Sequence, residues 1–228
     1  MPSKSTPSPG STKTAETRRE LVGAVLAEAG TTYARQAGIR LTNKPAPLWR
    51  LLVLSNLIST RIKADIAVRA ARELIDAGGG TPKGMGDLTW QQRVDALGRA
   101  HYVRYDEGTA TRLGECADLA RDRYAGDLRR LARDAGERRE RVLELLREFP
   151  GIGPSGALIF CREAQEVWPF LRPVLDEKAL AGATRVGLPE TATALAELVD
   201  GDDLARFAAA LVRIDLNRDL AAKVTASG

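Results

Sequence analysis

The sequence is poor in aromatic residues, cysteine and histidine. Aromatic residues make up 5% of its 228 positions, so the core must be built largely from Ala, Leu, Val and Ile, which favours packed helices. The two cysteines, Cys116 and Cys161, are too few for a four-thiolate zinc or iron–sulfur site. We therefore expect no metal and no other cofactor, and we expect both thiols to stay reduced in a cytosolic compartment.

Long apolar runs are also missing. No stretch approaches the length of a membrane-spanning helix, and the first residues, MPSKSTPSPGSTKTAETRRE, lack the apolar middle of a signal peptide. These absences predict a cytoplasmic protein with no membrane partner. The formal net charge of +4 is a modest basic bias, compatible with a nucleic-acid partner but not specific for one.

Apolar residues recur with helical spacing along most of the chain, and no run alternates as a strand would. Caps and breakers support several boundaries, such as Thr89 before one helix and Gly78-Gly79-Gly80 after another. The sequence therefore predicts an all-α fold. The helices are expected over residues 14–30, 48–58, 65–77, 90–97, 107–124, 137–148, 155–164, 176–186, 192–199 and 203–214.

The segment from Phe149 to Ala157 reads as a tight turn between two helices. The glycines of Pro150-Gly151-Ile152-Gly153 allow backbone angles that a Cβ forbids and permit close approach to another surface, while Ile152 can fold back as an apolar peg. Pro154 suits the first helical position. Because the free N–H groups of such a loop and helix point outward together, Gly151, Ile152, Gly153, Ser155 and Gly156 are candidates for binding a DNA phosphate.

The region from about Trp49 to Leu188 resembles the helix-hairpin-helix superfamily of base-excision DNA glycosylases, of the endonuclease III type. Four separated segments carry the resemblance. They are the hairpin Phe149-Pro150-Gly151-Ile152-Gly153, the loop Trp168–Pro173 with the following Leu175-Asp176, the segment Arg185-Val186-Gly187-Leu188, and the upstream Leu57-Ile58-Ser59-Thr60-Arg61. The resemblance implies a two-lobed helical DNA glycosylase fold.

On this resemblance the chain divides into four parts. A disordered basic arm covers residues 1–17, and a helical barrel lobe covers 45–164 and ends in the helix-hairpin-helix at 137–164. A second helical lobe, made of 18–44 and 165–216, carries the catalytic-type aspartate. Residues 217–228 form a flexible tail.

The resemblance also implies residue roles. Asp176 falls at the catalytic aspartate, and Lys178, at a position where the family has histidine, has the reach to contact a phosphate. Arg61 matches the polar residue that wedges into the duplex. The alternative for Asp176 is a helix cap without chemistry, and the two roles are compatible. The neighbourhood of the base pocket is expected to include Asn56, His101, Tyr102 and Tyr105, the alternative being that these residues pack a helix junction.

The sequence departs from the family pattern at informative places. The bifunctional members have a lysine where this chain has Ser155, and without an amine no Schiff base forms, so lyase activity is not expected. The adenine-mismatch branch also has serine there, but its catalytic glutamate would fall near Asn56. The iron–sulfur cysteines are absent, as is that branch's C-terminal domain.

These observations predict a monomeric, cytoplasmic, nucleoid-associated DNA repair enzyme. It is expected to be a monofunctional glycosylase that acts on double-stranded DNA containing a lesion or mismatch and hydrolyses the N-glycosidic bond of a flipped-out base. Three alternatives stay open. They are a bifunctional glycosylase and lyase using another lysine, such as Lys63 or Lys178, a non-catalytic helix-hairpin-helix DNA-binding protein, and a helical scaffold with an incidental hairpin.

Overall fold

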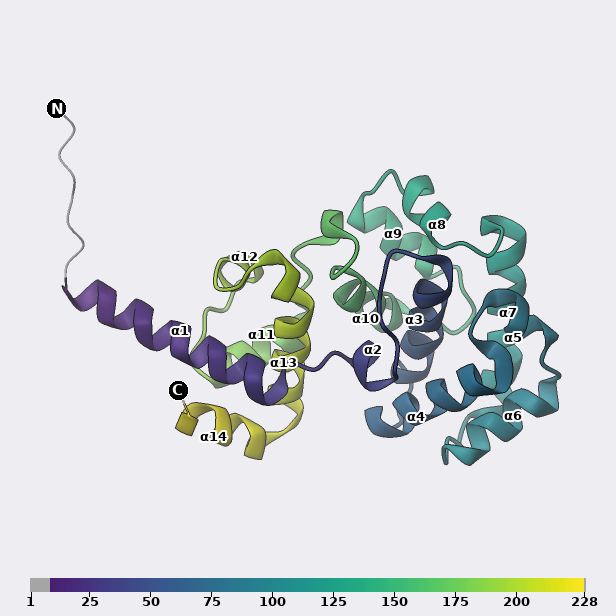
Figure 1. Ribbon diagram of the computed structural model, residues 1–228, viewed down its shortest axis with the longest axis horizontal. Coiled ribbons are helices and arrows are strands. Elements are labelled where there is room, and N and C mark those ends of the chain that lie inside the picture. Colours follow the sequence, from purple (N-terminus) through teal and green to yellow (C-terminus); the bar gives the residue numbers. More distant parts are fainter. Residues whose placement is uncertain (1–8, 228) are drawn as a thin grey trace. The chain divides into compact units, whose positions relative to one another are not determined.

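The computed structural model describes residues 9–227, with side chains described for 16–226, and it contains only helices and loops over that range (Figure 1). The prediction of an all-helical chain is confirmed. The helices fall into two compact units, one made of residues up to Thr31 together with those from Leu175 onward, the other made of Thr32–Val174.

The larger unit contains α2 to α10 and the two short turns η1 and η2. Their bounds are α2 Tyr33–Gln36, α3 Pro45–Ile58, α4 Ala64–Leu74, the π-helical turn η1 Ile75–Gly79, α5 Pro82–Asp87, α6 Trp90–Arg99, α7 Asp106–Tyr124, α8 Arg129–Asp134, α9 Arg139–Leu146, α10 Pro154–Ala164 and the 3-10 turn η2 Pro169–Leu171.

Helix α3 is the centre of this unit. It is apolar on nearly every side, as a helix surrounded by others must be, and it packs against α4 and α10. The indole Nε1 of Trp49 donates to the carbonyl oxygen of Gly79 at 3.0 Å, and Arg50 Nε donates to that of Gly80 at 3.2 Å. The central helix therefore satisfies the carbonyl groups left free where η1 ends.

A second group of helices, α5, α6 and α7, is joined by one guanidinium. Arg93 Nη1 donates to the carbonyl oxygens of Met85 and Leu88 at 3.0 and 2.7 Å, and its Nε donates to that of Ala110 at 2.9 Å. Burial lowers the pKa of Arg93 from its ordinary value, while the charge of Asp118 opposes that shift. The predicted cap at Thr89 is confirmed, because its hydroxyl accepts from Gln92 N at 3.1 Å and starts α6.

The boundary between the units differs from the expected one. Residues 32–44 and 165–174 belong to the larger unit, not to the lobe that carries Asp176. The buried Glu163 carboxylate accepts from the backbone N–H groups of Tyr33 and Ala34 at 3.2 and 2.8 Å, which ties α2 to α10. The Gln165 side chain likewise bonds both backbone groups of Val174 at 2.9 Å.

The smaller unit consists of α1 Pro9–Ala29, α11 Glu177–Arg185, α12 Ala192–Ala196, the 3-10 turn η3 Gly201–Asp203, α13 Leu204–Leu216 and α14 Arg218–Ser227. Helix α13 packs against α1, α11 and α14. Two expectations need correction here. The helix α1 begins at Pro9, inside the arm predicted to be disordered, whose residues 1–8 lie outside the described range. The predicted flexible tail forms α14, held by the buried side chains of Ala221 and Val224.

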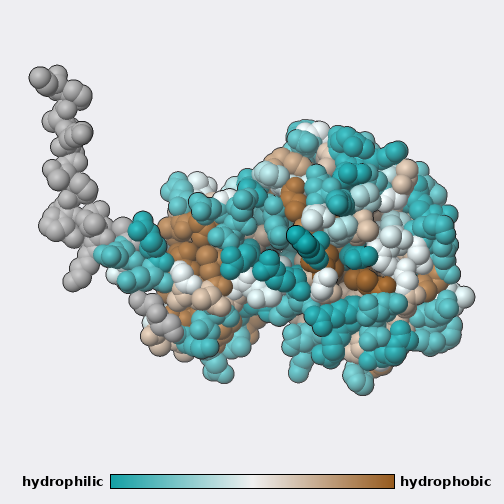
Figure 2. Space-filling view, viewed as in Figure 1, coloured by the Kyte–Doolittle hydropathy of each residue, from teal (hydrophilic) through white to brown (hydrophobic). Residues whose placement is uncertain are grey.

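Most of the face of the larger unit seen in Figure 2 is hydrophilic, with apolar residues in scattered small areas. Three large apolar side chains of the described residues are exposed, those of Trp90, Val103 and Leu216. Among the described residues, none of the helices has the length and apolar character needed to cross a membrane.

The closest helix contact of the smaller unit gives a test of the fold. A Cβ at Gly182 in α11 would lie 1.9 Å from the carbonyl oxygen of Leu211 in α13. We expect Gly182→Ala to force the helices apart and to lower the free energy of unfolding by about 1–3 kcal/mol, measured by urea titration.

Gly23 in α1 is the matched control, because a Cβ there meets no atom within 4 Å. Gly23→Ala should leave stability unchanged or raise it by about 0.5–1 kcal/mol, since alanine is the better helix former. Equal effects of the two substitutions would contradict the close packing of α11 on α13.

Candidate nucleic-acid interface

The predicted hairpin connects α9 to α10. Gly151 has φ of +81°, a conformation that side chains with a Cβ rarely adopt, so glycine is required there. The Ile152 side chain is buried, and Ile152 N donates to the carbonyl oxygen of Phe149 at 2.9 Å. Pro154 occupies the first turn of α10, as its lack of an N–H group favours. The turn geometry and the apolar peg expected from the sequence are both present.

Two buried side chains hold the hairpin from behind. The Pro150 carbonyl oxygen accepts from Asn56 Nδ2 at 2.8 Å and lies 3.2 Å from Cys116 Sγ, which donates to it. Asn56 comes from α3 and Cys116 from α7, so the loop is fixed to both helices. Burial raises the pKa of the Cys116 thiol to about 12, with the charge of Glu115 adding to the shift. The thiol therefore stays protonated and remains a hydrogen-bond donor at neutral pH.

The front of the hairpin is open. A Cβ at Gly153 would meet no atom within 4 Å, and the backbone there, with φ of −85°, is allowed to any residue. The structure thus corrects the expectation that both glycines are needed for backbone angles, because only Gly151 is. Ser155 is exposed, and α10 has no side-chain cap. The first N–H groups of α10, including those of Ser155 and Gly156, have no acceptor within the helix; Ser155 is exposed and could present its N–H to an anion, whereas Gly156 is buried.

The loop after α3 meets the same end of α10, and a second loop is joined to it. A Cβ on Gly156 would lie 3.4 Å from Ser59 Cβ, which puts the loop after α3 against the start of α10. The hydroxyl groups of Thr60 and Tyr102 share a hydrogen bond of 3.0 Å, which joins that loop to the one between α6 and α7. Arg61 and His101 are exposed on these loops. The sequence-predicted residues of the larger unit therefore gather at one end of it.

Two members of the expected base pocket have structural roles instead. Tyr102 is fully buried, so neither face of its ring is open to a base, and its hydroxyl links two loops. Asn56 is 1% exposed, and its amide is used to hold Pro150. Burial against neighbouring helices, which residue type alone does not reveal, accounts for both corrections. Tyr105 is half-buried, with the guanidinium of Arg104 5.2 Å from its ring centre.

Arg112 is a residue of this site that the motifs do not mark. It lies on α7, and a Cβ on Gly151 would lie 2.9 Å from its Cδ. Its Nη2 donates to Thr109 Oγ1 at 3.0 Å, whereas its Nε is buried with no partner in the described structure. Arg112 and Gly151 are 39 positions apart in the sequence, so only the packing of α7 behind the hairpin could have identified this contact.

Asp176 lies in the smaller unit, where it caps α11. Its Oδ1 accepts from Ala179 N at 3.1 Å, its φ and ψ are extended as those of an N-cap should be, and the residue is half-buried. The next two residues, Glu177 and Lys178, are exposed in the first turn. The N-cap role, the alternative to catalysis for Asp176, is therefore present, and the bond from Ala179 N orients the carboxylate.

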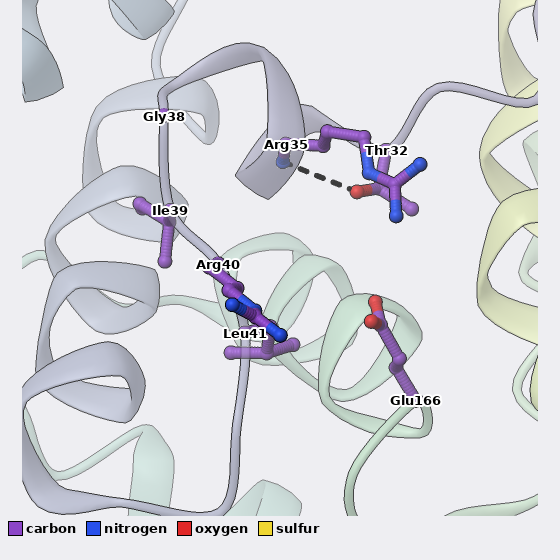
Figure 3. Close-up of a pocket in the computed structure, with 7 residues that line it drawn as sticks. All are labelled: Thr32, Arg35, Gly38, Ile39, Arg40, Leu41 and Glu166. Carbon is purple, nitrogen blue, oxygen red and sulfur yellow. Dashed lines mark hydrogen bonds between the residues drawn. The ribbon is translucent and has the colours of Figure 1, made fainter.

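A separate pocket of about 230 Å³ lies beyond the other end of α10. Thr32, Arg35, Arg40 and Glu166 are among its lining residues, and Figure 3 shows the carboxylate of Glu166 directed toward the two guanidinium groups. None of the residues predicted for the site lines it. Within the described residues no group of three or more His, Cys, Asp or Glu side chains is placed to hold a metal ion.

Comparison with known proteins gives one kind of match. No family model matches the chain, and no curated protein does. Among solved structures, the chain is similar to a trapped endonuclease III–DNA covalent intermediate in an estranged-adenine complex, with 14% identity and a TM-score of 0.46 over 75% of this chain and 74% of that one. It is also similar to a non-covalent endonuclease III–DNA complex, with 13% identity and a TM-score of 0.46 over 75% and 73%. Sequence identity and TM-score are low for both complexes, so this similarity assigns no role to any residue of the chain.

The different demands on the two hairpin glycines give a testable prediction. Gly151→Ala combines an unfavourable positive φ with a Cβ 2.9 Å from Asn56 Nδ2, so we expect the free energy of unfolding to fall by about 1–3 kcal/mol. Gly153→Ala, the matched control, should change it by less than about 0.5 kcal/mol because its Cβ enters open space. Urea titration of both variants checks this, and a costly Gly153→Ala would contradict the open front of the hairpin.

Proposed function

We propose that this protein is a monofunctional DNA glycosylase that hydrolyses the N-glycosidic bond of a damaged or mismatched base in double-stranded DNA. The observation that carries the proposal is the hairpin, whose front is open at Gly153 and whose following helix begins with uncapped N–H groups. A DNA phosphate is an anion that such a helix start binds well, and the missing side chain lets the backbone come close.

The neighbouring loop supports a duplex as the partner. Arg61 is exposed on the loop after α3, and this loop packs against the hairpin end of α10 through Ser59 and Gly156. Guanidinium groups placed beside a phosphate-binding hairpin extend the contact along a nucleic-acid backbone. Arg61, from the loop after α3, is the proposed wedge that occupies the space left by a flipped-out base.

Asp176 is the proposed catalytic residue. Hydrolysis of an N-glycosidic bond develops positive charge on the sugar, and a carboxylate next to the anomeric carbon stabilises that charge or activates the attacking water. Capping α11 does not conflict with this role, because the bond from Ala179 N fixes the carboxylate in one orientation. Lys178, exposed in the same turn, is proposed to contact a phosphate.

Ser155 is the reason to propose a single activity, hydrolysis without a lyase step. It is exposed on the first turn of α10, where the resemblance places the lysine of the lyase-active members, and a hydroxyl forms no Schiff base with a sugar aldehyde.

The capping role of Asp176 favours one second candidate, a protein that binds DNA through the hairpin without releasing a base.

The open front of the hairpin tests DNA binding. A leucine side chain at Gly153 is compatible with the backbone there and would occupy the space proposed for the phosphate. We expect Gly153→Leu to weaken duplex binding about tenfold, the effect of losing roughly 1.4 kcal/mol of contact, and to leave the melting temperature unchanged. Fluorescence anisotropy at two salt concentrations measures it, with Gly23→Leu on α1 as the control.

Unchanged affinity of Gly153→Leu, or binding by the unsubstituted protein that does not weaken with salt, would leave the helical-scaffold alternative in place. That alternative predicts no specific contact at the hairpin.

The catalytic role is tested by Asp176→Asn. Asparagine caps a helix about as well as aspartate, so the fold should persist while the negative charge is lost. A panel of damaged and mismatched duplexes first identifies the one from which the unsubstituted protein releases a base. On that duplex we expect Asp176→Asn to slow single-turnover base release by about 100-fold or more. Glu177→Gln, one residue further along and exposed, is the control and should keep full activity.

Two outcomes would contradict this assignment. Base release that survives Asp176→Asn would remove Asp176 from catalysis, and no release from any duplex despite salt-sensitive binding would favour the non-catalytic candidate. A covalent adduct trapped by borohydride would contradict the single activity and point to an amine such as that of Lys63.

A further inference from the structure

A pocket of about 380 Å³ lies at the start of α7. It is lined by Arg104, Tyr105, Asp106, Glu107, Gly108 and Arg112. Arg112 connects this pocket to the back of the hairpin, because a Cβ on Gly151 would lie 2.9 Å from its Cδ. A volume of this size lies within the range of about 300–1,000 Å³ typical of small-molecule sites.

The lining combines hydrogen-bond donors and acceptors. Arg104 and Arg112 bring guanidinium groups, which only donate, and Asp106 and Glu107 bring carboxylates, which only accept. A simple anion would be repelled by the two carboxylates, and a simple cation by the two arginines. A neutral, planar molecule with acceptors on one edge and donors on another fits better, and the Tyr105 ring supplies an aromatic wall.

The donor and acceptor side chains are held in place. Thr109 Oγ1 accepts from Arg112 Nη2 at 3.0 Å and orients that guanidinium. Asp106 Oδ1 accepts from Glu107 N at 2.8 Å, which orients the carboxylate. Arg104 lies against the Tyr105 ring at 5.2 Å. Because these groups are not neutralised by one another, they are available to a ligand.

We propose that this pocket binds an unpaired guanine base. Guanine presents O6 and N7 as adjacent acceptors, which suit arginine, and N1–H with the 2-amino group as adjacent donors, which suit a carboxylate. Arg104 and Arg112 donate to the first edge, and Asp106 accepts from the second. Adenine has an amino donor where guanine has O6, and cytosine has no equivalent pair of acceptors, so both leave pocket groups unpaired.

The base has two possible sources, an unpaired guanine in DNA and a free guanine nucleotide. The DNA source rests on the proposed function, whereas recognition of the base does not. The experiment therefore has a nucleotide arm that requires no DNA binding and no catalysis, and a DNA arm that requires binding alone.

In the nucleotide arm, GMP, IMP, AMP and 7-deaza-GMP are titrated into the ¹⁵N-labelled full chain, and the amide resonances of Tyr105 and Gly108 are followed. IMP differs from GMP only in lacking the 2-amino group, and 7-deaza-GMP lacks only the N7 acceptor. We expect GMP to shift both resonances and to bind about tenfold more tightly than each of the other three, as the loss of a paired hydrogen bond predicts.

The substitution that separates base reading from simple stacking is Asp106→Asn. It should bring the affinity for GMP to that for IMP while leaving the affinity for IMP within about twofold, since the lost partner is the 2-amino group. Asp122→Asn is the matched control, because it removes the same charge from an exposed position of α7 that does not line the pocket and should keep the preference. Equal melting temperatures of the two variants show that the fold is retained.

The proposal would be overturned if no nucleotide shifted the two amide resonances, or if all four nucleotides bound equally well. It would also be overturned if the Asp106→Asn variant still bound GMP more tightly than IMP. In the DNA arm, duplexes with one extrahelical guanine or hypoxanthine are compared by anisotropy. A guanine preference that Asp106→Asn abolishes supports the DNA source. Equal binding of both duplexes, with the nucleotide preference intact, assigns the pocket to a free nucleotide and leaves the proposed glycosylase activity to its own test.

Discussion

The hairpin depends on a single carbonyl group. The partly buried Pro150 oxygen lies behind the loop and accepts from Asn56 on α3 and Cys116 on α7. A buried carbonyl left without a donor costs about 1–3 kcal/mol, so these donors strongly favour one loop position. They also place the open side of the loop, at Gly153, away from the core. Affinity for a phosphate at this loop therefore requires little ordering on binding, because the loop is already fixed.

The same constraint explains why polar side chains occur inside an apolar core. Helix α3 is buried along almost its whole length, yet it includes Ser55 and Asn56. The Ser55 hydroxyl donates to the carbonyl oxygen of Leu51 in its own helix at 2.8 Å. Asn56 Nδ2 instead donates to the Pro150 carbonyl oxygen in the hairpin. The Asn56 Oδ1 atom is left without a partner in the described structure. The Asn56 side chain therefore fixes the loop through Nδ2 while its Oδ1 is left unsatisfied.

Local chemistry was readable from the sequence, and long-range burial was not. The hairpin, the Thr89 cap and the first-turn Pro154 follow from residues within a few positions of each other. The roles of Asn56 and Tyr102 depend on partners 94 and 42 positions away, and the unit boundary depends on Glu163 bonding Tyr33 and Ala34, about 130 positions distant. No periodicity records such pairings. Short helices such as α2 and α8 were missed because tertiary contacts, not propensity, stabilise single turns.

Asp176 shows how structural and chemical roles can share one side chain. The Asp176 carboxylate accepts from Ala179 N of the helix that it caps, and it lies at the positive end of the helix dipole. A group that stabilises positive charge on a sugar must be fixed in position beside that charge. The cap therefore supplies the fixed position that the chemistry would need. A cap at this position is compatible with catalysis as well as with a purely structural role, and only loss of charge with the cap retained separates the two.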